Sequence, residues 1–106
     1  PAVPAAPAAA APVTVIDGAP LYGLMLGWGP YLRDVSASGN VIRRAPIGIA
    51  VSVVEGAGTA MIGDNLIAGA TRGAILGMRW AEPVSGDLAR SGAEGFPNLA
   101  IARNPV

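Results

Sequence analysis

The sequence predicts an all-β fold, a small β-barrel or β-sandwich built from two related β-units, preceded by an extended Ala/Pro-rich N-terminal arm. Three observations lead to this prediction. Short runs of alternating large and small residues indicate strands, turn-forming residues separate these runs at regular intervals, and one glycine-rich phrase occurs twice. Short strands at such spacing are typical of small barrels and sandwiches.

The first segment, residues 1–13, contains only Pro, Ala and Val. Proline fixes its own φ and disfavours helix in the residue before it, so we expect an extended or polyproline-like arm. Such a segment cannot bury a core of its own, and we expect it to be ordered against a neighbouring subunit. The candidate partner-binding residues of the arm are Pro1, Val3, Pro4, Pro7 and Pro12.

The remaining residues, 14–106, are predicted to form a single β-domain. In IGIAVSVV, large aliphatic residues alternate with Gly, Ala and Ser over residues 47–54, which indicates a strand with one bulky and one small face. The same alternation occurs over residues 22–28, 76–80 and 99–102. Turn signals lie between these runs, at 17–18, 36–40, 55–58, 63–65, 84–87 and 90–95.

An α-helical interpretation competes with this one. Gly69, Gly73 and Gly77 are spaced by four, as in the close-packed helices of a glycine-zipper hairpin. A glycine inside a helix costs about 1 kcal/mol relative to alanine, and Val and Ile are weak helix formers. We therefore favour strands and keep the helical hairpin as the alternative.

The repeated phrase is YGLMLG at residue 22 and RGAILG at residue 72. Each phrase is followed, after a variable stretch, by a second related strand, so the sequence suggests a pseudo-repeat of residues 22–54 and 72–106. Coincidence in a chain this rich in Gly and Ala is the alternative explanation.

The composition excludes several classes of function. Only 13% of the residues are charged, against about 25% in a typical soluble domain, so we expect apolar surface to be covered by neighbouring subunits. Charged residues interrupt every long apolar run, which argues against a helical membrane span. The net charge is zero, and we expect no binding to nucleic acid.

The chain also lacks the residues on which most catalysis depends. It has no His, Lys or Cys, and its acidic residues are dispersed along the sequence. A serine nucleophile would have no obvious base to activate it. We therefore expect neither an enzyme nor a bound cofactor or metal ion.

Four further residues are candidates for partner binding. Arg43 and Arg44 are consecutive, so in a strand they point to opposite faces; they either pair with an acid of a neighbouring subunit or are simply solvated. Trp28 and Trp80 follow the two repeated phrases, and each lies either in the core or at an interface as an anchor.

The stretches RGAILG, ASGNVIRRAPIGIAVSVVEGAGTAMIG and FPNLAIARNPV together resemble the small head decoration (cement) proteins of tailed bacteriophages. The resemblance implies a structural protein on the outside of a capsid, often trimeric, that clamps shell subunits and reaches across them with an N-terminal arm. Its partners would be the major capsid protein or identical subunits, and its location the virion surface.

A secreted or cell-envelope protein that self-assembles into a filament or coat is the alternative. The chain begins at Pro1, so we expect that either an initiator Met or a signal peptide has been removed. The capsid hypothesis requires only the Met, whereas the secreted alternative requires a signal peptide.

Overall fold

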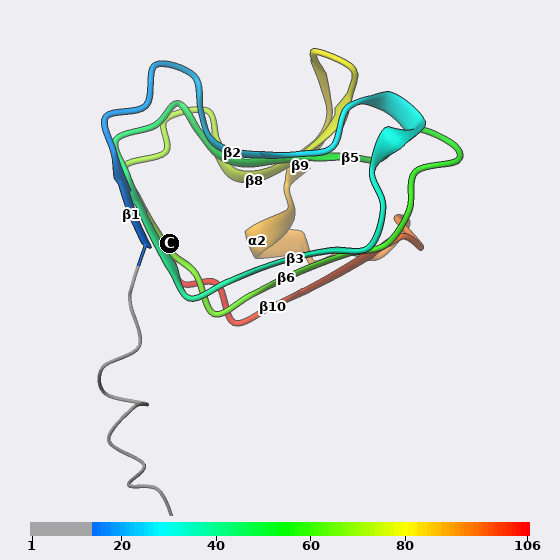
Figure 1. The fold of residues 1–106 in the computed structure, drawn as a ribbon. Helices are drawn as coiled ribbons and strands as arrows, with labels where there is room; N and C mark the ends of the chain where they lie inside the picture. The colour runs from blue at the N-terminus through cyan, green and yellow to red at the C-terminus, as the bar shows by residue number, and fades with distance from the viewer. Residues whose placement is uncertain (1–13) are drawn as a thin grey trace, which may run out of the picture.

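Residues 14–106, which the computed structural model describes, wind through three successive coils (Figure 1). The coils enclose a shared apolar interior. The first coil contains β1 (Thr14–Asp17), β2 (Tyr22–Leu26), the 3-10 helix η1 (Gly29–Tyr31) and β3 (Val35–Ser38). The second contains β4 (Asn40–Arg43), β5 (Ile47–Ser52) and β6 (Ala60–Gly63). The third contains β7 (Leu66–Ala68), β8 (Gly73–Arg79), β9 (Glu82–Asp87), α2 (Leu88–Ser91) and β10 (Leu99–Ala102).

Each coil adds one strand to each of three sheets, and the third coil also adds β9; this is the arrangement of a parallel β-solenoid. The strand orders are β1-β4-β7, β3-β6-β10 and β2-β5-β8-β9. All pairs are parallel except β8 with β9. Ile16 pairs with Ile42 and Ile42 with Ile67, so equivalent residues lie 26 and 25 positions apart.

The predicted closed barrel or sandwich is therefore wrong: the chain has a β-rich fold of three mostly parallel sheets. Alternation identifies a strand but not its partner, and here each strand pairs with a strand one coil away. The helical hairpin is also wrong, because Gly73 and Gly77 lie within β8 and the described residues contain only a four-residue α-helix, α2.

The two fifty-residue units of the prediction are corrected as well. The repeated phrases do occupy one sheet, as β2 and β8, but two coils apart. Leu24 pairs with Ile49, and Ile49 pairs with Ile75, so the structural offset is one residue longer than the offset of fifty that aligns the phrases. The repeating unit is the coil of about 25 residues.

The interior is filled by aliphatic side chains that stack from coil to coil. One stack contains Ile16, Ile42 and Ile67, of which Ile42 is fully buried, and another contains Leu24, Ile49 and Ile75. Each buried aliphatic side chain contributes about 1.5–3 kcal/mol by leaving water. β5 is buried on both faces, because a second cluster lies on its outer side, made of Ile47, Ala50, Leu76 and Met78.

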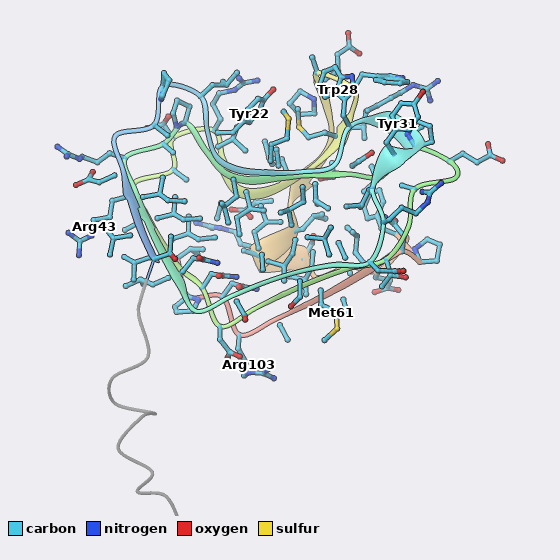
Figure 2. All side chains as sticks on the ribbon, in the orientation of Figure 1. Tyr22, Trp28, Tyr31, Arg43, Met61 and Arg103 are labelled. Carbon is cyan, nitrogen blue, oxygen red and sulfur yellow. The ribbon has the colours of Figure 1, made fainter. Side chains whose placement is uncertain are left out.

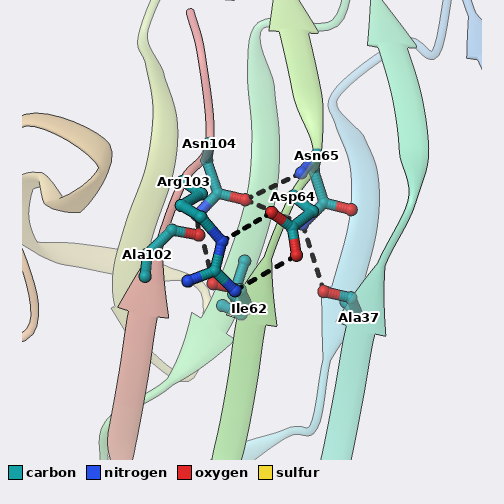
Figure 3. A network of polar contacts seen from close by, with 7 residues as sticks. All are labelled: Ala37, Ile62, Asp64, Asn65, Ala102, Arg103 and Asn104. Carbon is teal, nitrogen blue, oxygen red and sulfur yellow. Dashed lines mark hydrogen bonds and ion pairs between the residues drawn. The ribbon is translucent and has the colours of Figure 1, made fainter.

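An asparagine ladder lines the corner where β3 leads into β4 and β6 into β7 (Figure 3). Asn40, Asn65 and Asn104 occupy equivalent places, and Asn65 is fully buried. The Asn65 side chain accepts from the backbone and side-chain nitrogens of Asn40, at 3.1 and 2.9 Å. It donates to Asn104 Oδ1 at 2.9 Å and to the carbonyl of Ala37 at 3.1 Å.

The residue before each ladder asparagine has a left-handed backbone. Gly39, Asp64 and Arg103 have φ of 71°, 58° and 55°. This conformation makes the sharp bend between two sheets, and the asparagine that follows satisfies the backbone groups that the bend leaves unpaired.

The two ends of the coil stack differ. At the C-terminal end, β9 extends the edge of β8, and Leu88 of α2 is buried against the interior. At the N-terminal end, no strand within residues 14–106 pairs with the outer edges of β1, β2 and β3. The interior side chains of this first coil are only half-buried at Ile16, Leu24 and Val35. We call this surface the open end.

Candidate functional site

Three aromatic side chains meet on the outside of the molecule, where β2 and β8 end (Figure 2). The rings of Trp28 and Trp80 lie 5.6 Å apart at 73°, and those of Tyr31 and Trp80 lie 6.4 Å apart at 69°. Trp28 and Trp80 are each 42% exposed, and Tyr31 is 73% exposed. We call Trp28, Tyr31 and Trp80 the aromatic corner. Such a cluster left facing water is a signature of a binding surface.

The backbone beneath these rings adopts two left-handed conformations. Trp80, in the turn from β8 to β9, has φ of 53°, which a bulky residue adopts at a cost of about 1–2 kcal/mol. Gly29 in η1 has φ of 56°, and a β-carbon at Gly29 would collide with the indole of Trp80. The Trp80 ring therefore lies directly on the backbone of η1.

Two polar side chains fix η1 in place. The hydroxyl of buried Ser52 donates to the carbonyl of Gly29. Arg33 Nη1 donates to the carbonyls of Pro30 at 2.6 Å and Leu32 at 2.7 Å. It also reaches the Gly56 carbonyl at 3.2 Å, which connects the first coil to the second. The aromatic corner is thus held on a pre-formed support.

Replacing Gly29 with alanine is expected to displace the Trp80 ring and to reduce the near-ultraviolet circular dichroism of the Trp28–Trp80 pair by about half. Gly18→Ala is the matched control, because Gly18 has φ of 78° but no atom within 4 Å of an added β-carbon. It imposes the same left-handed strain without touching a ring. Equal spectra for the two variants would contradict this account of the corner.

Among the proposed site residues that lie within residues 14–106, the structure brings the two tryptophans together in one cluster. Trp28 and Trp80 meet in the aromatic corner, whereas Tyr31, its most exposed member, was missed. The only sequence signal for Tyr31 is its place after the Gly-Pro that follows Trp28. The arm residues Pro1, Val3, Pro4, Pro7 and Pro12 lie outside the described residues.

The two arginines lie at the corner between β4 and β5. Arg44 forms an ion pair within the chain, from its Nε to Asp17 Oδ1 at 2.6 Å. The hydrogen bond from Arg44 lowers the pKa of the Asp17 carboxyl below its ordinary value. Arg43 is exposed on the outside, away from the aromatic corner (Figure 2), and forms no ion pair within residues 14–106.

A second surface is the outer face of β3, β6 and β10, where a shallow groove of about 540 Å³ is floored by small side chains. Met61 stands in it, 58% exposed, and the ion pair of Arg103 with Asp64 lies at one end, with distances of 2.7 and 3.2 Å. The hydrogen bond from Arg103 lowers the pKa of Asp64.

This groove is poorly suited to acid–base catalysis. Ser36 and Ser38 line it, but the carboxylate of Asp64 is paired with Arg103, and a lowered pKa makes a carboxylate a weaker base. Across residues 14–106, no group of three or more acidic, His or Cys side chains is placed to hold a metal ion. Over the same residues no helix has the length and apolarity to span a membrane.

No protein-family model, curated protein or solved structure matches this chain.

Proposed function

We propose that this chain is a non-enzymatic structural module that works by associating with other subunits through the open end of its coil stack. The observation that carries this proposal is the set of three strand edges, β1, β2 and β3, which no strand within residues 14–106 covers. Unpaired edges next to a half-buried apolar interior are a ready-made surface for strand addition.

The direction of the backbone hydrogen bonds supports the proposal. The N–H of Gly18 donates to the backbone carbonyl of Arg43 in the second coil, and the N–H of Val35 donates to the backbone carbonyl of Thr59. Successive N–H groups of a strand point to opposite sides. The N–H groups of Val15 and Ser36 therefore point out of the open end, toward an incoming strand.

The occupant that we propose is the open end of a second copy. Stacking onto a C-terminal end is blocked in one sheet, because β9 covers the edge of β8. A two-fold axis through the middle of β2 would instead pair β2 with the β2 of the second copy, and β1 with the β3 of the second copy. The second pairing is matched in length, because β1 and β3 each have four residues. This arrangement closes as a dimer, unlike the trimer that the family resemblance implies.

The proposed setting is the surface of a bacteriophage head, where such a module would stabilise the assembled shell by binding it in preference to free subunits. Its partners there would be the major capsid protein and identical subunits. A secreted coat or filament is the alternative setting. It would be favoured by a hydrophobic leader encoded before Pro1.

The test of end-to-end association is the double variant Val15→Pro, Ser36→Pro. Both side chains are exposed, and each proline removes an N–H that points out of the open end, so the coils should keep their own ladders. By sedimentation velocity we expect the wild-type chain at twice the monomer mass or more and the variant at a clearly lower mass, with equal far-ultraviolet circular dichroism.

The matched control is Val15→Thr, Ser36→Thr, which keeps both N–H groups and places a β-branched side chain at each position, and it should remain dimeric. A monomeric wild-type chain, or a proline variant as dimeric as the threonine control, would overturn the proposed open-end association.

A further inference from the structure

We propose that the aromatic corner binds the proline-rich segment Pro1–Pro7 of a second copy of this chain. The proposal rests on the proposed association between copies. It assigns that association a second surface, separate from the open end, and a specific chemical partner.

The segment reads PAVPAAP, with Pro1, Pro4 and Pro7 three positions apart. A polyproline II helix has three residues per turn, so this spacing places all three rings along one side of the helix. The residues between them are Ala and Val, which leave the proline rings prominent. Pro12 breaks the spacing, because the fourth position of the series is Ala10.

The aromatic corner has the chemistry that recognises such a helix. The rings of Trp28 and Tyr31 each stand at a steep angle to that of Trp80, which leaves notches between ring faces into which a flat pyrrolidine ring can pack. Polyproline II has no internal hydrogen bonds, so its carbonyls are free to accept from an indole N–H or the Tyr31 hydroxyl.

Both partners are also arranged to lose little conformational freedom on binding. Ser52 and Arg33 hold the backbone of η1, and the Trp80 ring rests on Gly29. Proline restricts the segment before it binds. Pre-organisation of this kind raises affinity by reducing the ordering cost. It also gives a reason for the left-handed backbone of Trp80, which directs an aromatic side chain to this corner.

The length of the segment favours a second copy over the chain's own corner. Seven Cα–Cα steps separate Pro7 from Thr14, a span of about 22 Å as polyproline II. β1 and the aromatic corner lie at opposite ends of β3 (Figures 1 and 2). β3 itself takes up about 13 Å, and residues 28–34 lie beyond it. About 9 Å of the linker then remains for the path past residues 28–34 to the outward-facing rings, which favours the corner of a second copy.

The first experiment titrates a synthetic peptide of residues 1–13 into the ¹⁵N-labelled full-length chain. The two indole N–H resonances, which belong to Trp28 and Trp80, report on binding. We expect saturable shifts, an affinity at least about tenfold weaker for the Pro4→Ala peptide, and an affinity within about twofold of wild type for the Pro12→Ala peptide. Equal affinities for these two peptides, or no saturable shift, would overturn the proposal.

The protein side is tested with Tyr31→Ala. Tyr31 is the most exposed ring and should be removable without loss of the fold. This variant should bind the peptide at least about fivefold more weakly than wild type while keeping its far-ultraviolet circular dichroism. Unchanged affinity would show that the corner is not the binding surface.

A second experiment distinguishes binding of the segment of a second copy from binding of the chain's own segment. The chain has no cysteine, so Ala2→Cys accepts a single nitroxide label. Mixing the labelled ¹⁴N chain with unlabelled ¹⁵N chain should broaden the indole resonances of the ¹⁵N chain. Broadening only when the label and ¹⁵N share one molecule would mean that the segment folds back on its own corner, contrary to the proposal.

The test of peptide binding at the aromatic corner is independent of the test of open-end association. The same peptide titration on the Val15→Pro, Ser36→Pro variant should give an unchanged affinity, because neither residue belongs to the aromatic corner. Failure of open-end pairing would thus leave peptide binding intact, whereas loss of peptide binding in the wild-type chain would leave the sedimentation result unaffected.

Discussion

Replacing Asn65 with alanine is expected to lower the free energy of unfolding by about 3 kcal/mol or more. The side chain is fully buried and forms four hydrogen bonds, two with Asn40, one with Asn104 and one with the carbonyl of Ala37. Alanine would leave several of these partners buried and unpaired, and each orphaned group costs about 1–3 kcal/mol. Because the three asparagines connect successive coils, the loss should affect the whole stack rather than one turn.

Urea unfolding followed by circular dichroism measures this loss, with Asn40→Ala as the matched control. Asn40 lies at the end of the ladder and is half-buried, so its removal leaves the contacts between Asn65 and Asn104 in place. We expect Asn40→Ala to cost about 1 kcal/mol. Equal losses for the two variants would mean that the ladder does not act as a continuous unit.

Gly48→Ala is expected to be nearly as damaging, at about 2–3 kcal/mol. Gly48 lies in β5, where an added β-carbon would stand 2.5 Å from the carbonyl oxygen of Ala74 and equally close to Ile67 Cγ2. The first of these atoms belongs to the backbone of the third coil and cannot move without opening the sheet. The added methyl group would therefore force the second and third coils apart.

The matched control for this prediction is Gly86→Ala in β9, where an added β-carbon meets no atom within 4 Å. The free energy of unfolding, measured with urea, should fall for Gly48→Ala. For Gly86→Ala it should remain within about 0.5 kcal/mol of wild type. A Gly48→Ala chain as stable as the control would show that the coils are less closely packed than described.

The sequence located several strands correctly but not their partners. The predicted runs around residues 47–54, 22–28 and 99–102 contain β5, β2 and β10, because alternation of large and small residues depends only on local strand geometry. This alternation does not indicate whether the neighbouring strand is a hairpin partner or belongs to the next coil. Parallel pairing needs a long connection, and here that connection is the rest of the coil.

The signal for the coil was present in the turns. GNVI at residue 39 and DNLI at residue 64 repeat at the true spacing of 25 residues, and both contain a ladder asparagine. The sequence predicts turns at these asparagines, because asparagine is common in turns of every kind. The predicted turn at residues 84–87 was also wrong, since these residues belong to β9, where Ser85 bonds to the Gly77 backbone.

The candidate site could be predicted only in part. The sequence predicts that each tryptophan lies either in the core or at an interface, and the structure leaves each of them 42% exposed. Their contact could not be predicted, because Trp28 and Trp80 belong to the first and third coils. The contact depends on the position of η1 and on the left-handed turn at Trp80, and neither has a clear signature in the sequence.

The corner that holds the asparagine ladder determines how this kind of chain can change in length. Each coil leaves that corner and returns to it one strand spacing away, about 4.8 Å along the stack. A duplication or deletion of one whole coil of about 25 residues would therefore restore the same corner, the same three sheet directions and the same stacked isoleucines. Residues 82–91 show how a shorter insertion is accommodated at the end of the stack, because β9 pairs with the outer edge of β8 and α2 follows it. The fold thus permits growth in whole-coil steps along its axis.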